Sequence, residues 1–123
     1  MKKFLLPIFV VISFIDPAWA DSEKEVVQVL ASCLVENAPE NWDELSVHYS
    51  RDGVNEKGLN QVSVKHSVSV GGVTSRLEPC RPLIPTMLVE KLSKNLPENS
   101  QQWKAADIKI FKTGRFSIDW IQP

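Results

Sequence analysis

The sequence QVSVKHSVSVGGVTSRL, residues 61–77, contains the clearest secondary-structure signal in this chain. From Val62 to Val70 every second residue is valine or histidine, and the residues between them are polar. A period of two is typical of a strand with one buried face and one exposed face. Gly71-Gly72 follows, and glycine accepts the positive φ that a two-residue hairpin turn requires. The alternation resumes at Val73, so two antiparallel strands joined by a tight turn are predicted.

Three further segments alternate in the same way. Residues 45–50 place Leu, Val and Tyr on one face and Ser, His and Ser on the other. The polar residues 51–58 follow, with two glycine turn signals, and predict a loop. Near the end of the chain, residues 108–110 and 116–120 alternate around a turn at Thr113-Gly114. These segments predict three more strands.

A first helix is predicted before the strands. Ser22 and Glu25 form a capping-box pattern at its start. Apolar residues then recur at helical spacing from Val26 to Leu34, with Cys33 on the same stripe. Pro39 ends the helix by residue 38, because the residue before a proline avoids helical geometry.

A second helix is predicted between the third and fourth strands. Pro85 suits the first turn of a helix, and Pro97 ends it. Residues 99–104 then form a short connection around Trp103. The expected buried stripe consists of Met87, Leu88, Leu92 and Leu96.

The resulting order of elements is α-β-β-β-α-β-β. Hairpin-linked strands pair antiparallel, and helices then cover one face of the sheet. We therefore expect an α+β fold, with a single antiparallel sheet of about five strands and two helices on one face. The other face, rich in polar residues, is expected to meet solvent or a partner.

Residues 1–20, MKKFLLPIFVVISFIDPAWA, have the pattern of a secretory signal peptide. Two lysines precede an apolar run, and Ala18-Trp19-Ala20 is a small-x-small cleavage site. The run is too short for a membrane span, which needs roughly 20 apolar residues. We expect cleavage near Ala20, a single mature domain over residues 21–123, and a periplasmic location without a membrane segment.

The two cysteines, Cys33 and Cys80, both follow the expected cleavage site. In an oxidising compartment an even number of cysteines favours a disulfide. A redox or metal pair is the weaker alternative, because the spacing is not C-x-x-C and few histidines are present. No metal or other cofactor is expected.

Charge is distributed unevenly along the expected mature chain. Residues 21–60 contain three basic and nine acidic side chains, a net charge of −6, whereas residues 61–123 contain nine basic and five acidic ones, a net charge of +4. The small overall negative charge does not favour nucleic-acid binding. Either an acidic face results, which would steer a basic partner, or the two halves interleave in space and the charges cancel.

No catalytic motif is present in the sequence. There is no G-x-S-x-G elbow, and Gly71-Gly72 is a hairpin rather than a phosphate-binding loop. His66 lies on the valine side of its strand and is expected to be a partly buried, hydrogen-bonded histidine. His48 lies on a polar face and is a candidate for binding. We therefore expect a protein that is not an enzyme; a small hydrolase, with His48 as the first residue to test, is a rival hypothesis.

Two acidic segments are candidates for contact with a partner. One surrounds Trp42, an aromatic residue of the kind enriched at interface hot spots; core packing is the alternative for this residue. The other is the predicted loop after residue 50. Together with His48, the candidate partner-binding residues are Glu40, Trp42, Asp43, Glu44, His48, Asp52 and Glu56.

The ending FKTGRFSIDW, residues 111–120, after the helix stop at Pro97 and after Trp103, resembles small bacterial immunity proteins. With the signal peptide, the whole chain resembles periplasmic immunity proteins of the type VI secretion system, and in particular those that neutralise a VgrG-type effector with a lysozyme-like domain. The resemblance rests on size and element order and includes no invariant motif.

This resemblance implies a partner, a mechanism and an assembly. The partner would be a cognate secreted peptidoglycan-degrading effector, whose catalytic cleft the protein would occlude to protect the producing cell. It also implies a homodimer. The rival hypotheses are a periplasmic ligand-binding or envelope-stress module and an inhibitor of host lysozyme.

Overall fold

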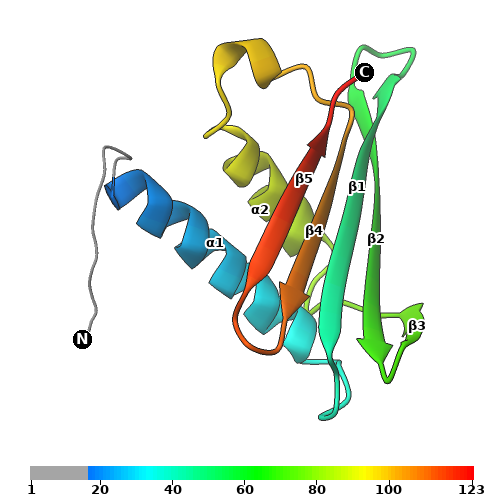
Figure 1. The fold of residues 1–123 in the computed structure, drawn as a ribbon. Coiled ribbons are helices and arrows are strands. Elements are labelled where there is room, and N and C mark those ends of the chain that lie inside the picture. Colours follow the sequence, from blue (N-terminus) through cyan, green and yellow to red (C-terminus); the bar gives the residue numbers. More distant parts are fainter. Residues whose placement is uncertain (1–16) are drawn as a thin grey trace.

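The computed structural model describes residues 17–123, with side chains from Glu23 onward. Its helices and strands follow the predicted order α-β-β-β-α-β-β, which confirms the α+β fold (Figure 1). In chain order the elements are α1 (Pro17–Val35), β1 (Glu44–Val54), β2 (Asn60–Val70), β3 (Val73–Arg76), α2 (Leu83–Ser93), the 3-10 turn η1 (Glu98–Ser100), β4 (Ala105–Phe111) and β5 (Phe116–Ile121).

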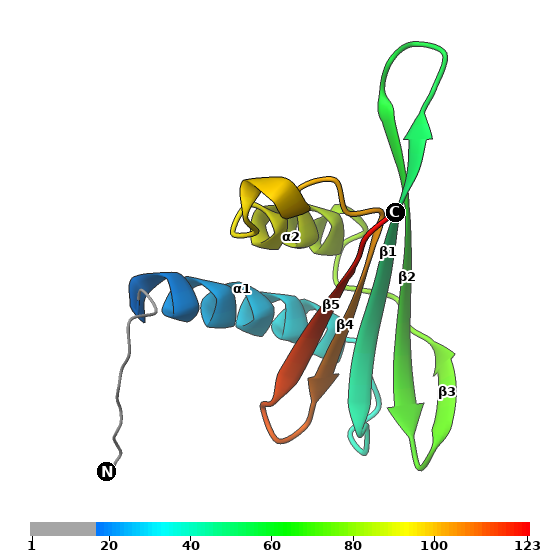
Figure 2. The same ribbon diagram turned by 45° about the horizontal axis from the view of Figure 1, so that its top comes forward.

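The strands form one antiparallel sheet in the order β3-β2-β1-β4-β5, so β1 is the central strand. Both helices lie on the same side of this sheet, as Figures 1 and 2 show. Gly71 and Gly72 connect β2 to β3 with φ values of 57° and 84°. Positive φ at both positions is what a tight hairpin requires, so the predicted turn is confirmed.

The core lies between the helices and the alternating apolar residues of β1. Leu45, Val47 and Tyr49 are each at most 1% exposed. The register places residues of β2 and β4 beside them on the same face, including Val68 and Ile110 opposite Leu45. Helix α1 contributes the predicted stripe, with Val26, Val27, Leu30, Cys33 and Leu34 all buried.

Two helix predictions need correction. Helix α1 does not begin at a Ser22 cap, because it already runs from Pro17; proline suits a first turn and alanine has the highest helix propensity, so the residues before Ser22 extend the helix. In α2, Met87 is 63% exposed. The predicted Leu92 is buried, and Leu88 and Leu96 pack partly buried against the core. The buried face of α2 contains Pro85, Val89 and Ser93 beside Leu92, spaced by about one turn.

The predicted loop over residues 51–58 is also shorter than expected. Strand β1 continues to Val54, with a register shift between Arg51 and Gly53, and Gly53 has a φ of 108°. A bulge of this kind absorbs one extra residue and lets the strand continue. The polar composition that suggested a loop reflects exposure on both faces, because this part of the hairpin projects beyond the sheet (Figure 2).

The expected disulfide joins Cys33 and Cys80. It links α1 to the segment between β3 and α2, and the Cys80 amide also donates to the Cys33 carbonyl at 3.0 Å. Asn37 Nδ2 donates to the Glu78 carbonyl at 3.0 Å beside it. The bridge is compatible with an exported protein. It fixes the point at which the chain leaves the sheet.

The predicted signal peptide is described only in part. Its lysines and apolar run lie outside the described residues, and the expected cleavage site falls within the first turns of α1. Across residues 17–123, neither helix combines the length and the apolarity needed to cross a membrane.

Replacing Cys33 and Cys80 together by alanine should lower the free energy of unfolding by about 4 kcal/mol, because the bridge closes a loop with a sequence separation of 47 residues. Urea unfolding of the oxidised protein and the double variant measures this difference. The reduced wild-type protein is the control and should match the variant within about 1 kcal/mol. An unchanged midpoint in the variant would contradict this role for the bridge.

Candidate functional site

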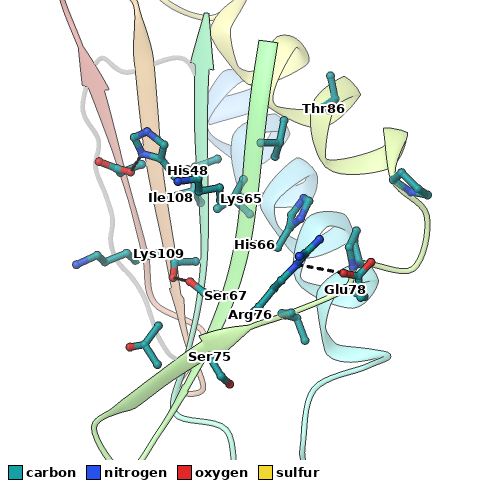
Figure 3. Close-up of a pocket in the computed structure, with 18 of the residues that line it drawn as sticks. His48, Lys65, His66, Ser67, Ser75, Arg76, Glu78, Thr86, Ile108 and Lys109 are labelled. Carbon is teal, nitrogen blue, oxygen red and sulfur yellow. Dashed lines mark hydrogen bonds and ion pairs between the residues drawn. The ribbon is translucent and has the colours of Figure 1, made fainter. Parts of the chain in front are cut away.

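The face of the sheet away from the helices is polar, and His48 lies at its centre. The register sets His48 between Lys65 of β2 and Asp107 of β4. His48 Nδ1 lies 2.5 Å from Asp107 Oδ1, and the two side chains are 46% and 40% exposed. Figure 3 shows His48 and Lys109 on this side of the sheet and His66 on the side of the helices. Asp107 therefore fixes the orientation of the His48 ring on an open surface.

Hydroxyl groups on this open face bond to one another across the strands. Ser46 and Ser67 are joined by a hydrogen bond of 2.8 Å, and Ser69 and Thr74 by one of 2.9 Å. A serine nucleophile needs a hydrogen bond to its base, and among residues 23–123 no such bond joins a serine to His48. The same residues contain no group of three or more His, Cys, Asp or Glu that could hold a metal ion. The hydroxyl groups of this face are therefore bonded to one another across the strands and not to His48.

The first acidic segment lies at the end of the sheet where β1 begins. Asp43 is bonded on three sides: its Oδ2 accepts from the Gly71 amide at 2.6 Å, its amide donates to the Ser69 carbonyl, and its carbonyl accepts from the Lys112 amide. Asp43 thus links the segment before β1 to the β2–β3 and β4–β5 turns. These three hydrogen bonds hold the three segments together.

Trp42 and Glu40 are also held by the β4–β5 turn. Trp42 is partly buried against the core, and Lys112 Nζ lies 5.3 Å from the centre of its ring. Lys112 Nζ also donates to the Glu40 carbonyl. The positive charge of Lys112 therefore offsets part of the acidic character here, which comes from the side chains of Glu40, Asp43 and Glu44.

The second acidic segment belongs to the projecting end of the β1–β2 hairpin, residues 52–61, which we call the arm (Figure 2). Asp52 lies within β1 and accepts hydrogen bonds from Ser50 and Ser63, and these bonds hold the pKa of its carboxyl below the usual range. Glu56 lies in the exposed turn. Asp52 therefore fastens the two strands of the arm, and Glu56 is displayed at its tip.

The turn of the arm is ordered by Asn55. Its side-chain Oδ1 accepts from the amides of Lys57 and Leu59, each at 2.9 Å. Its backbone amide donates to the Leu59 carbonyl, and its carbonyl accepts from the Gly58 amide. A side-chain amide that bonds its own turn restricts the backbone. The arm tip is therefore preorganised.

The seven candidate residues thus occupy three separate places. Glu40, Trp42, Asp43 and Glu44 lie at one end of β1, His48 lies at its middle, and Asp52 and Glu56 lie in the arm at the opposite end. The two acidic segments do not form one continuous acidic face. Asp107 was missed by the sequence analysis, although the alternation around Ile108 places it on the polar face; its pairing with His48 depends on the strand register.

A second group of polar residues lies between the sheet, α2 and the segment before β4. The Arg51 guanidinium lies 3.6 Å from the centre of the Trp103 ring and donates to the carbonyls of Gln101 and Trp103. Tyr49 donates to the Glu90 carboxylate. Burial and this carboxylate raise the pKa of Tyr49 strongly. These contacts hold Trp103, which is 1% exposed, in the core.

Beside β2 the surface is hollowed. A hollow of about 1140 Å³ extends along β2 and β3. Val64, His66, Leu83 and Thr86 line it toward the helices, and residues of β1 and β4 on the open face, such as His48 and Lys109, line it as well. A smaller hollow of about 590 Å³ shares Val62 and Thr86 with it. Figure 3 shows His66 and Thr86 on the side of α2. The two hollows therefore adjoin along β2.

His66 differs from its expected state. Its Nε2 is buried and has no hydrogen-bond partner among the described protein atoms, so the prediction of a hydrogen-bonded histidine is wrong. Its cross-strand neighbour is Val47, and Arg76 and Glu78 line the same hollow as the ring. Burial lowers its pKa; the charge of Glu78 opposes this effect and that of Arg76 adds to it.

No protein-family model matches this chain, and no curated protein matches its sequence significantly.

Stability should fall as the pH decreases through about 6.5, because the unfolded His66 binds a proton near that pH whereas the folded ring has a lower pKa. The loss continues down to the pKa of the folded ring. Urea unfolding between pH 8 and about 5 measures it. His66→Gln should flatten this dependence, because it removes the titrating ring, and the wild-type protein measured in parallel should retain it. An equal slope in His66→Gln and in the wild-type protein would assign the effect to other groups.

Asp43→Ala should lower the free energy of unfolding by about 1 kcal/mol, because the Gly71 amide loses its acceptor and the contact between three loops is weakened. Thermal and urea unfolding measure the change. Glu40→Ala is the matched control, because the Glu40 hydrogen bond uses the backbone carbonyl and not the side chain. Its free energy of unfolding should stay within about 0.5 kcal/mol of the wild-type value. Equal stability of the two variants would show that the Asp43 bond contributes nothing.

Proposed function

We propose that this protein is a periplasmic immunity protein that binds and occludes the active-site cleft of a type VI secreted peptidoglycan hydrolase with a lysozyme-like domain. It would protect the producing cell from effector delivered by sister cells. The proposal rests on the resemblance of residues 111–120 and of the chain as a whole to such immunity proteins. The disulfide, which suits an oxidising compartment, agrees with a periplasmic location. The protein would act by binding, without catalysis of its own.

The observation that carries the proposal is the arm. It projects beyond the rest of the sheet (Figure 2), and it exposes Val54 and Leu59 by 63% and 60%. Exposed apolar side chains on a narrow projection do not contribute to the core and fit a contact surface. With Asp52, Glu56 and Lys57 the arm has a net charge of −1, and its narrow shape suits insertion into a cleft, where Glu56 would meet cationic or catalytic groups.

Preorganisation supports the same role for the arm. Asn55 orders the turn and Asp52 fastens the strands, so little conformational entropy would be lost on binding. The contact would be completed by neighbouring surfaces, since a stable complex buries on the order of 1,600 Å² in total. His48 on the open face and the Glu40–Glu44 segment are the further candidate contacts.

An alternative within the same mechanism is an inhibitor of host lysozyme, for which only the target differs. A second alternative, a periplasmic ligand-binding or envelope-stress module, is favoured by the hollow beside β2. It predicts a rise in melting temperature with a small molecule. If adding about one equivalent of this protein inhibits a secreted peptidoglycan hydrolase, that result favours the main proposal over both alternatives.

Glu56→Lys should slow association with the hydrolase by about tenfold and invert the salt dependence of the rate, because a charge at the tip meets the partner first. Stopped-flow association and a wall-lysis assay measure the effect. Glu98→Lys, the same charge change in the exposed turn η1, is the matched control and should inhibit lysis normally.

Glu40→Lys with Glu44→Lys tests the opposite end of β1. If these changes abolish inhibition while Glu56→Lys leaves it intact, the arm is not the inserted element. If all the variants inhibit like the wild-type protein, the proposal that acidic side chains enter the cleft is wrong.

A further inference from the structure

Strand β2 has a free edge over half of its length. Strand β3 pairs only with Ser67–Val70, and one further bond joins the Leu77 amide to the His66 carbonyl. In the described part of the chain, residues 60–65 have no strand partner on the side away from β1. Unpaired backbone groups at a sheet edge are a template for an added strand.

The unpaired groups at this edge can be identified. The His66 carbonyl points away from β1, since it accepts from Leu77. Backbone groups of alternate residues point to the same side of an antiparallel strand, so the amide and carbonyl groups of Val62 and Val64 also point to the free edge. They face the hollow described above, whose lining includes both valines.

An apolar wall accompanies this edge. Val62 of β2 is 38% exposed, and Leu83 at the start of α2 is 70% exposed. Val62 and Leu83 both line the hollow. Strand β5, at the other edge of the sheet, contains no large exposed hydrophobic residue. Exposed apolar side chains therefore gather at the β2 edge and not at the β5 edge.

On the open face of the sheet this edge carries the positive charge of Lys65, and the Asp52 carboxylate of β1 accepts from Ser63, two residues before Lys65. Residues 60–66 contain Lys65 and no carboxylate, and Lys65 is exposed. Arg76 lies at the end of β3 beside the same hollow, where it is paired with Glu78 at 3.4 Å. An added strand would place alternate side chains toward α2 and toward Lys65. Apolar residues suit the first set, and acidic residues suit the second.

We propose that the free edge of β2 binds an extended segment of a partner protein, in which apolar and acidic residues alternate, as an additional strand. The backbone of Val62 and Val64 would supply the hydrogen bonds, and the wall formed with Leu83 and the charge of Lys65 would select the side chains. A second copy of β2 fits this edge less well, because it would bring another Lys65 and no carboxylate. The residues that would make the contact, Val62, Val64, Lys65 and Leu83, lie outside the arm, so the proposal stands apart from the proposed function.

The test uses two short blocked peptides, one alternating valine and glutamate and one alternating valine and lysine. The glutamate peptide should bind the full protein and slow hydrogen exchange at the Val62 and Val64 amides in NMR spectra. Lys65→Glu should lower the affinity for the glutamate peptide about threefold and raise the affinity for the lysine peptide by a similar factor. The change is small because cross-strand charge pairs contribute modestly. Lys94→Glu, the same change at an exposed residue after α2 that lines neither hollow, is the matched control and should leave both affinities unchanged.

Val64→Pro provides an independent variant. It removes an amide that faces the free edge, where proline is tolerated, and leaves the ladder with β1 in place. The variant should keep a native circular dichroism spectrum, which shows that it folds, and should no longer bind the glutamate peptide. Equal affinity of both peptides for the wild-type protein, or a Lys65→Glu variant without a change in preference, would overturn the proposal. So would sedimentation as a dimer whose Val64 amide is protected, because a second copy would then occupy the edge.

Discussion

The burial of one face of β1 is the constraint on which the rest of the structure depends. Leu45, Val47 and Tyr49 are buried against the helices, and β1 is paired on both sides. A slip of one residue would turn all three into solvent and bring His48 into the core. The register is therefore fixed across β2, β1 and β4, and the polar face, with Lys65, His48 and Asp107 in one row, is a direct consequence.

The arm exists because β1 and β2 are longer than the core they cover. Strand β4 pairs with β1 only as far as Ser50, with one further bond from Arg51 to Lys104. Beyond this point both faces of the hairpin meet solvent, and a lone two-stranded hairpin is only marginally stable. Here the side-chain hydrogen bonds of Asp52 and Asn55 stabilise the hairpin, whereas packing against the helices stabilises the rest of the sheet. That polar bonding, rather than burial, keeps Val54 and Leu59 in exposed positions.

The disulfide has a consequence for the sheet edge. After Arg76 the chain turns away from β2 toward α1, where Cys80 joins Cys33. Strand β3 is therefore short, and the remainder of the β2 edge stays open beside α2. One covalent link thus stabilises the fold by restricting the unfolded chain and also leaves the unpaired backbone of Val62 and Val64 at the surface.

The sequence by itself determined the element order, the buried faces of β1 and β2, the glycine hairpin and the disulfide, because each depends on local periodicity, on the φ preference of glycine or on an even cysteine count. It misjudged Met87, His66 and the extent of β1, since these depend on which neighbours cover a residue. Only the tertiary structure decided that His48 meets Asp107, that the acidic segments lie at opposite ends of β1, and that Asp43 links three loops. Strand register and the meeting of distant loops join residues far apart in the chain, and local pattern carries no information about such pairs.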